Sequence, residues 1–230
     1  MTRGSERRLL DGAAGAIEIA LDWPAGDACP DGMLRGLACI GHPHPLFGGT
    51  LDNKVAATMA RAFCAAGWLA VRPNFRGVGR SAGSHDGGTG ETDDFLRVIN
   101  AMPQYGDVAA RLAGTAPRAL AGFSFGSFVA ARAAAALAAG GRPPDRLILV
   151  GAAAGKWPLP PVPADTLVIH GELDETIPLA DVFDWARPMA LPVIVVPGVD
   201  HFFHRHLTVL KNLITRHLSS VEPRESLSAE

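Results

Sequence analysis

The sequence predicts an α/β protein in which helices cover both faces of a doubly wound, mostly parallel sheet with an antiparallel start. Short apolar runs alternate along the chain with segments whose apolar residues recur at helical spacing, and short turns join them. Several apolar runs are continuous instead of alternating, which is typical of parallel strands buried on both faces. We expect one domain over residues 1–230, ending in a polar tail over 219–230.

Eight segments have the composition of strands. The first two are expected to pair antiparallel across Asp11 and Gly12, and the third is stopped by a His-Pro-His-Pro run. The predicted strands are Arg7–Leu10, Ala16–Leu21, Leu37–Gly41, Trp68–Arg72, Ala119–Gly122, Arg146–Val150, Thr166–His170 and Val193–Val196.

Five segments have apolar residues at helical spacing. The first of them ends just before Gly67, a residue type that commonly terminates helices. The predicted helices are Lys54–Ala66, Glu91–Met102, Ser127–Ala139, Leu179–Met189 and a last one from about Phe203 to Leu218. The stretch Ala152–Ala164 is rich in proline and is predicted to be a loop, too short for a helical cap. We therefore expect no lid domain and an open, shallow site.

The composition excludes several classes of protein. With 48% hydrophobic and 19% charged residues, the chain is too apolar and too weakly charged to be disordered. Its net charge of −2 and the lack of a Lys/Arg stripe argue against a nucleic-acid partner or an anionic membrane surface. The longest apolar stretch, Phe128–Ala139, is interrupted by Arg132 and is shorter than the ~20 residues of a membrane-spanning helix.

The N-terminal residues and the cysteines indicate the compartment. Met1 to Arg8 are not followed by the apolar segment of a signal peptide, so we expect a cytoplasmic protein. Three cysteines without metal-binding spacing are expected to be reduced thiols. They are Cys29, Cys39 and Cys64.

A candidate nucleophile stands between a predicted strand and a predicted helix. Ser124 is the centre of a G-x-S-x-G motif, in the strand–turn–helix context that this motif requires. Gly122 and Gly126 would let strand and helix approach closely around an exposed Ser124 Oγ. The Phe125 N–H, at the helix N-terminus, would face an oxyanion formed at the serine. The alternative is a helix-capping serine flanked by glycines that serve packing alone.

Candidates for an acid and a base follow in the order that such a motif predicts. A serine hydroxyl needs a base to take its proton, and the base needs a carboxylate to orient it. Asp174 follows one predicted strand and His201 follows the next, so both should lie at the edge of the sheet that carries Ser124. Asp200 adjoins His201 too closely to reach its Nδ1, and His170 is interpreted as structural. Surface positions are expected for Glu172, Glu175, His204 and His206.

The loop after the third predicted strand should supply a second oxyanion donor. Pro43 and Pro45 have no N–H, so the N–H of His44 is the first choice and that of Leu46 the second. His42 and His44 lack a third ligand nearby, so no metal site is expected.

A glycine-rich segment, Arg72–Ser81, has neither the Gly-Lys-Ser/Thr ending of a P-loop nor a helix directly behind its glycines. We expect it to border the site, with Arg76 in a structural ion pair, and we expect no cofactor.

Together these motifs resemble an α/β-hydrolase. The resemblance covers residues 16–218 and rests on four segments in the family's order, which are His42–Gly49, Gly122–Gly126, His170–Pro178 and Asp200–Phe202. The His-Pro-His-Pro-Leu-Phe-Gly-Gly run and Asn74–Ser81 are similar to small bacterial hydrolases related to dienelactone hydrolases and acyl peptidases. Many relatives have His-Gly at the position of His42 and Pro43, and dienelactone hydrolases have Cys at the position of Ser124.

The resemblance implies a serine hydrolase without a lid. It implies Ser124 as the nucleophile, Asp174 as the acid, His201 as the base, and His42 as a structural residue ahead of the oxyanion donor. We expect cleavage of a small ester or thioester through an acyl-enzyme. A peptidase or amidase on the same triad, or a catalytically silent binding protein, are the alternatives. A homodimer through an edge strand or the final helix fits the sequence, which does not determine the oligomeric state. Residues considered for the pocket wall are Phe47, Phe123, Phe125, Trp157, Phe202 and Phe203.

Overall fold

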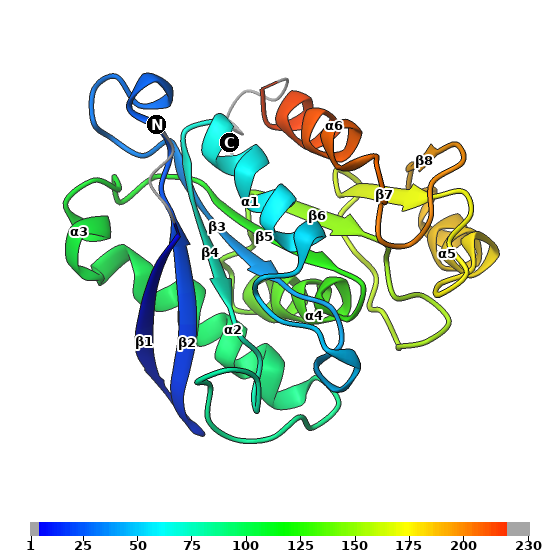
Figure 1. Ribbon diagram of the computed structural model, residues 1–230, viewed down its shortest axis with the longest axis horizontal. Helices are drawn as coiled ribbons and strands as arrows, with labels where there is room; N and C mark the ends of the chain where they lie inside the picture. Colours follow the sequence, from blue (N-terminus) through cyan, green and yellow to red (C-terminus); the bar gives the residue numbers. More distant parts are fainter. Residues whose placement is uncertain (1–4, 220–230) are drawn as a thin grey trace, which may run out of the picture.

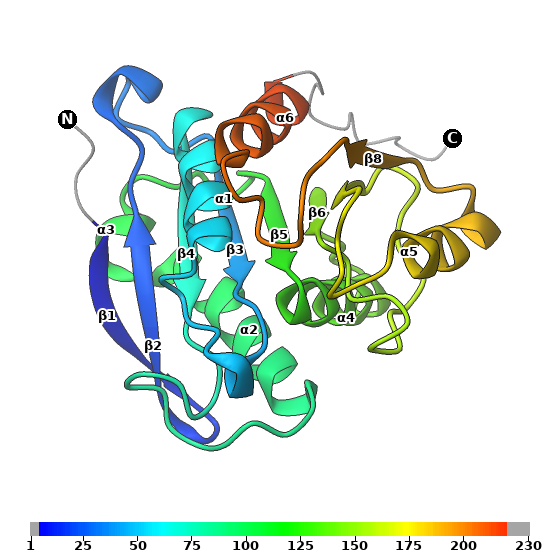
Figure 2. The same ribbon diagram turned by 45° about the vertical axis from the view of Figure 1, so that its right-hand side comes forward.

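The computed structural model describes residues 5–219, and one sheet runs through this part of the chain (Figures 1 and 2). Its strand order is β1-β2-β4-β3-β5-β6-β7-β8. The strands are β1 (Glu6–Gly12), β2 (Gly15–Asp22), β3 (Gly36–Gly41), β4 (Trp68–Pro73), β5 (Arg118–Phe123), β6 (Arg146–Val150), β7 (Leu167–Gly171) and β8 (Val193–Val196).

The sheet is antiparallel at its start and parallel thereafter. β2 pairs antiparallel with both β1 and β4, whereas every neighbouring pair from β4 to β8 is parallel. The predicted mostly parallel sheet with an antiparallel N-terminal strand is therefore confirmed. The carboxyl ends of the parallel strands lie at one edge of the sheet, which is where such folds assemble their sites.

Helices cover both faces of the sheet. They are α1 (Lys54–Ala65), α2 (Thr89–Ala101), α3 (Gly106–Ala109), α4 (Phe125–Ala139), α5 (Leu179–Ala186) and α6 (Leu207–Ser219). Short 3₁₀ helices are η1 (Gly26–Ala28), η2 (Pro45–Phe47), η3 (Met102–Gln104) and η4 (Arg187–Met189). α1 packs against α6 on one face, and α2 packs against α4 on the other (Figure 2).

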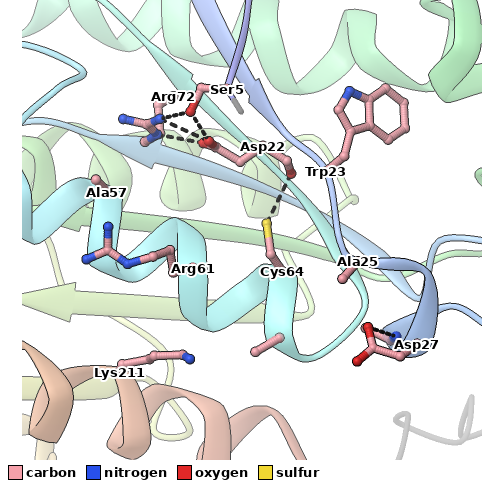
Figure 3. Close-up of a pocket in the computed structure, with 12 residues that line it drawn as sticks. Ser5, Asp22, Trp23, Ala25, Asp27, Ala57, Arg61, Cys64, Arg72 and Lys211 are labelled. Carbon is pink, nitrogen blue, oxygen red and sulfur yellow. Dashed lines mark hydrogen bonds and ion pairs between the residues drawn. The ribbon is translucent and has the colours of Figure 1, made fainter. Parts of the chain in front are cut away.

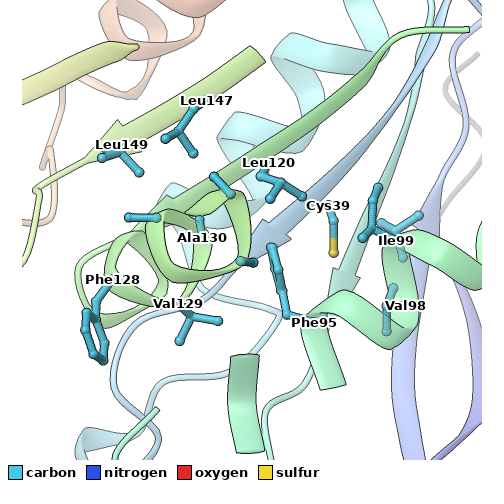
Figure 4. Close-up of a cluster of buried hydrophobic side chains, with 14 of the residues drawn as sticks. Cys39, Phe95, Val98, Ile99, Leu120, Phe128, Val129, Ala130, Leu147 and Leu149 are labelled. Atoms are coloured by element: carbon cyan, nitrogen blue, oxygen red, sulfur yellow. The ribbon is translucent and has the colours of Figure 1, made fainter. Parts of the chain in front are cut away.

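Each face of the sheet has its own hydrophobic core. Alternate residues of the wholly buried β3 enter different cores, with Cys39 on the side of α2 and α4 and Ile40 on the side of α1 and α6. Figure 4 shows the first core, where Leu120 of β5 lies among side chains such as Phe95 of α2 and Val129 of α4. This double burial explains why the strands are continuous apolar runs.

The segment between β6 and β7 contains no helix, and the expected absence of a lid is confirmed for the fold. In residues 5–219 we find no helix whose length and apolar character would allow it to cross a membrane. The predicted polar tail over 219–230 lies, apart from Ser219 at the end of α6, outside the described residues.

Three predicted helix starts were wrong. α2 begins at Thr89 instead of at Glu91. α4 begins at Phe125, directly after Ser124, instead of at Ser127. α6 begins at Leu207 instead of near Phe203, because Phe203 and Arg205 have positive φ angles of 54° and 64° that no α-helix contains. Phe203 is fully buried. Its side chain packs in the core, and the backbone forms a turn here instead of the first turn of a helix.

Candidate active site

Ser124 stands at a strained turn between β5 and α4. Its φ of 55° and ψ of −124° lie in a region that costs a non-glycine residue of order 1–3 kcal/mol. Three hydrogen bonds hold the turn. Ser124 N–H donates to Val150 O of β6 at 3.0 Å, and Ser124 O accepts from Ser127 N–H at 2.8 Å and from Ser127 Oγ at 2.6 Å. The strand-to-helix context that the sequence predicted for Ser124 is present.

Gly122 and Gly126 are required by the close approach of α4 to the sheet. A Cβ atom on Gly122 would lie 2.0 Å from the carbonyl oxygen of Gly126. A Cβ atom on Gly126 would lie 2.3 Å from the carbonyl oxygen of Gly41, at the end of β3. Because both obstacles are backbone atoms, a larger residue at either position would force the helix away from the strands.

Asp174 and His201 meet at the same edge of the sheet. His201 Nδ1 lies 2.6 Å from Asp174 Oδ2, and both side chains are buried. The other oxygen, Asp174 Oδ1, accepts hydrogen bonds from the N–H groups of Thr176 and Ile177 at 2.9 and 2.7 Å. A carboxylate held in this way is a fixed acceptor, so His201 donates through Nδ1 and keeps Nε2 as an acceptor.

The ring of His201 lies beside the turn that carries Ser124. Its centroid is 4.8 Å from that of Phe123, the residue before the serine. A Cβ atom on Gly151 would lie only 3.2 Å from His201 Cε1, so the residue after β6 also touches the imidazole. Ser124 Oγ makes no hydrogen bond within residues 5–219. Hydrogen bonds between a base and its nucleophile are often long before substrate binds and tighten in the complex.

The other acids and histidines of this edge have different partners. Asp200 pairs with His204 at the surface, with 2.5 Å between Oδ2 and Nδ1, and Glu172 accepts a hydrogen bond from Gly198 N–H. His170 is buried, and burial lowers its pKa. Its Nε2 lies 2.9 Å from the Ile177 carbonyl and 3.3 Å from Asp174 Oδ2, so it supports the loop that carries the acid.

His42 forms hydrogen bonds to two loops next to the candidate site. Its Nδ1 lies 2.6 Å from the carbonyl oxygen of Pro43, and its Nε2 accepts a hydrogen bond from Phe75 N–H at 2.9 Å. Burial lowers the pKa of His42 to about 4, which keeps the ring neutral and lets one nitrogen donate while the other accepts. His42 thereby links the loop after β3 to the loop after β4.

The two candidates for the second oxyanion donor differ in their bonding. Leu46 N–H donates to His44 Nδ1 at 3.2 Å, whereas His44 N–H has no partner in residues 5–219. Phe125 is the first residue of α4, so its N–H has no intrahelical acceptor. The rings of His44 and Phe125 pack 5.0 Å apart, which makes these residues neighbours beside Ser124.

A second histidine–carboxylate pair lies next to these donors, and the sequence analysis did not identify it. His85 Nδ1 is 2.6 Å from Oε1 of the fully buried Glu91. The ring of His85 packs against His44 at 4.6 Å and Phe125 at 5.3 Å. The one available signal was an acid placed three residues after Gly88 at a helix start, which is a capping pattern.

Aromatic residues considered for the pocket wall fall into two groups. Phe47 and Phe202 are 87% and 45% exposed, so they stand at the surface of the site. Trp157 is half-buried and packs 4.8 Å from Phe125. Phe125 itself is buried, as are Phe123 and Phe203, which belong to the core.

The glycine-rich loop is held by an ion pair. Arg76 Nε lies 2.7 Å from Asp94 Oδ2, which confirms the predicted structural role of this arginine. Hydrogen bonding to Asp94 raises the pKa of the Arg76 guanidinium. No group of three or more His, Cys, Asp or Glu side chains in the described part of the chain is arranged to hold a metal ion.

The comparisons with known proteins agree with this fold. Residues 52–182 match the family model described as serine aminopeptidase, S33. A lid-less serine hydrolase from Xanthomonas campestris is 36% identical and has a TM-score of 0.83, with 98% of each chain covered. A serine hydrolase homologue from Coxiella burnetii is 32% identical, with a TM-score of 0.74 over 95% of this chain and 98% of the other. An uncharacterized protein of Rickettsia prowazekii is 26% identical over 84% of this chain and 87% of its own length.

Proposed function

The chain belongs to the serine aminopeptidase S33 family of α/β-hydrolases, and from that premise we propose that it cleaves a small carboxylic ester or thioester through an acyl-enzyme. One observation carries the proposal. A buried His201–Asp174 pair, 2.6 Å apart, lies at the edge of the sheet where Ser124 occupies a strained turn. A base held by a carboxylate at the same sheet edge as a serine on a tight turn is the arrangement that nucleophilic catalysis by serine needs.

In the proposed mechanism Ser124 Oγ attacks the substrate carbonyl while His201 Nε2 takes its proton. The tetrahedral oxyanion collapses, and His201 returns the proton to the leaving alcohol or thiol. Water then attacks the acyl-enzyme, and His201 takes a proton from it as the new bond forms. The carboxylic acid leaves and Ser124 regains its proton.

Phe125 and His44 are the proposed oxyanion donors. One such N–H is worth ~2.7–4 kcal/mol of transition-state stabilisation. Because Leu46 N–H already donates to the His44 side chain, the bonding supports His44 as the second donor. The prolines on either side of His44 stiffen its backbone before substrate binds.

The surroundings of Ser124 support a compact acyl group. No helix lies between β6 and β7 in the described chain, and the side chains of Phe47 and Phe202 are exposed to solvent. The rings of His44, Phe125 and Trp157 form an aromatic wall beside the nucleophile. Such a wall offers apolar area and few polar groups, which suits the acyl part of a small ester.

A peptidase or amidase on the same triad is the second candidate. The description of the matching family, serine aminopeptidase, favours it. Parallel rates with p-nitrophenyl butyrate, butyryl thioesters and aminoacyl p-nitroanilides separate the candidates. Faster hydrolysis of the ester or thioester supports our proposal, and faster hydrolysis of the anilide contradicts it.

The decisive experiment labels the folded protein with a fluorophosphonate and locates the adduct by mass spectrometry. We expect the label on Ser124, and we expect Ser124→Ala to lose both labelling and ester hydrolysis. Ser219→Ala is the matched control, because Ser219 is exposed at the end of α6 and its Oγ donates only to the Thr215 carbonyl of its own helix. Full hydrolysis by Ser124→Ala would overturn the nucleophile assignment. A protein that neither labels nor hydrolyses any of these substrates would be a silent binding protein.

A further inference from the structure

A cavity outside the candidate active site lies between α1, α6 and the loop after β2 (Figure 3). Its volume is about 610 Å³, within the range of small-molecule sites. It is lined by Ser5, Asp22, Trp23, Ala25, Asp27, Ala28, Ala57, Arg61, Cys64, Ala65, Arg72 and Lys211. None of these residues belongs to the candidate active site.

One ion pair of this cavity is complete within the protein. Arg72 Nε and Asp22 Oδ2 are 2.7 Å apart, and Arg72 Nη2 also reaches Asp22 Oδ1 at 3.0 Å. Two further guanidinium donors of Arg72 go to the Leu51 carbonyl and to Ser5 Oγ. The charge of Arg72 is therefore compensated by Asp22 and is not available to a ligand.

Two further cations of the wall have no such compensation. Arg61 of α1 and Lys211 of α6 stand on facing helices beside the cavity (Figure 3). Neither takes part in an ion pair within residues 5–219, and Arg61 donates only to Thr58 Oγ1 of its own helix. Asp27, the remaining acid of the wall, lies apart from both of them in Figure 3. The end of the cavity near Arg61 and Lys211 therefore carries positive charge.

The rest of the cavity wall is mostly apolar, and its largest side chain, Trp23, is fixed in position. Four alanines leave the space open, and the ring of Trp23 forms one side. Trp23 is held by a hydrogen bond from Nε1 to Glu6 Oε2 at 3.1 Å and by the Arg111 guanidinium, 5.0 Å from the ring centroid. Burial raises the pKa of Cys64 to about 12, and its thiol donates to the Asp22 carbonyl. A protonated thiol is a poor nucleophile, so a ligand here would bind without covalent capture.

We propose that this cavity binds an organic monocarboxylate with an apolar body, whose carboxylate lies between Arg61 and Lys211. The head group would receive charge-assisted hydrogen bonds from both cations, and the apolar body would lie against Trp23 and the alanines. Because the cavity shares no residue with the candidate active site, binding here does not depend on the proposed hydrolase function.

The test measures octanoate binding by isothermal titration calorimetry, with octanol as an uncharged ligand of equal length. We expect octanoate to bind at least tenfold more tightly than octanol, since octanol has no charged group to accept hydrogen bonds from the two cations. The double variant Arg61→Gln/Lys211→Gln should weaken octanoate binding by about tenfold or more and leave octanol binding unchanged. Ala57→Leu should weaken both ligands because it fills the cavity.

Lys54→Gln is the matched control, since it removes an exposed cation of α1 that does not line the cavity. It should bind octanoate as the wild type does. The fluorophosphonate-treated protein should also bind octanoate unchanged, because the cavity is separate from Ser124. Octanoate binding that survives Arg61→Gln/Lys211→Gln, or that disappears on fluorophosphonate treatment, would overturn the proposal. Equal affinities for octanoate and octanol would do the same.

Discussion

Two histidine–carboxylate pairs of this protein are built alike and lie in different surroundings. In both His201–Asp174 and His85–Glu91, the imidazole Nδ1 is 2.6 Å from an oxygen of a buried carboxylate. In both, backbone N–H groups hold the carboxylate as well. A short bond to a buried acid therefore does not by itself mark the base of a catalytic site.

Position distinguishes the two pairs. His201 lies against Phe123, one residue before the strained Ser124, in a loop that follows the last strand of the sheet. His85 lies on the glycine-rich loop and packs against His44 and Phe125. Its acid, Glu91, also caps the start of α2. We therefore propose that the first pair moves a proton, whereas the second holds a loop and a helix end together.

The largest expected effect is on turnover, at the first pair. Asp174→Asn should reduce ester hydrolysis by roughly 10⁴-fold, because the amide no longer holds His201 in the tautomer that accepts a proton from serine. Steady-state kinetics with p-nitrophenyl butyrate measure this loss of turnover. A variant that stays folded and loses less than tenfold would contradict the assignment of Asp174 as the acid.

A smaller effect is expected on the pH dependence of stability. It concerns His42, a buried histidine whose ring has no carboxylate partner in the described part of the chain. His42 is held by the Pro43 carbonyl and Phe75 N–H, and burial lowers its pKa from 6.5 to about 4. The unfolded chain therefore takes up a proton before the folded one, so the native state loses stability as pH falls from about 6.5 to about 4. We expect a loss of about 3 kcal/mol attributable to this group.

Urea unfolding of the wild type and His42→Gln across that pH window checks this expectation. Glutamine keeps one donor and one acceptor but does not titrate. The variant should therefore show a flatter decline in the free energy of unfolding below pH 6.5, although it is less stable at neutral pH. Parallel declines of the two proteins would show that His42 does not titrate in this way.

The second pair should matter for stability more than for turnover. Glu91→Gln loses one of the two oxygens that accept from His85, Asp86 N–H and Gly88 N–H, which should cost about 1–3 kcal/mol of unfolding free energy. We expect turnover to fall by less than an order of magnitude, as for an interaction outside the reacting atoms. Thermal unfolding together with kcat and KM separates the two effects. A loss of turnover comparable to that of Asp174→Asn would assign His85 a part in the chemistry.

The smallest effect on stability and turnover is expected at a third histidine–carboxylate pair, which is exposed to solvent. His204 and Asp200 lie 2.5 Å apart, but their side chains are 73% and 46% accessible to solvent. Surface ion pairs contribute about 0–1 kcal/mol, so Asp200→Asn should change the melting temperature little and leave hydrolysis near the wild-type rate. This variant is also the control for its neighbour His201. A large loss of activity would mean that Asp200, and not Asp174 alone, supports the base.

Much of the fold and of the candidate site could be predicted because its signals are contiguous in the chain. Apolar runs marked the parallel strands, and Gly122, Ser124 and Gly126 mark a tight turn because a strand precedes them and a helix follows. Ser124, Asp174 and His201 each follow a different parallel strand, which placed them at one edge. The single domain over residues 1–230, the cytoplasmic location, the absence of nucleic-acid and membrane partners, and a homodimer stay predictions.

Features that depend on contacts between distant segments needed the folded chain. The start of α6 could not be read from helical spacing, because the buried Phe203 pulls the chain into a turn with positive φ. The choice between the His44 and Leu46 donors depends on where the His44 ring turns. The cavity joins Arg61 to Lys211, residues with no relation in sequence. Local periodicity in the sequence indicates which face of a helix or strand is buried. Hydrogen-bond partners and cavities depend instead on which elements come into contact, and the packing of the helices on the sheet determines those contacts.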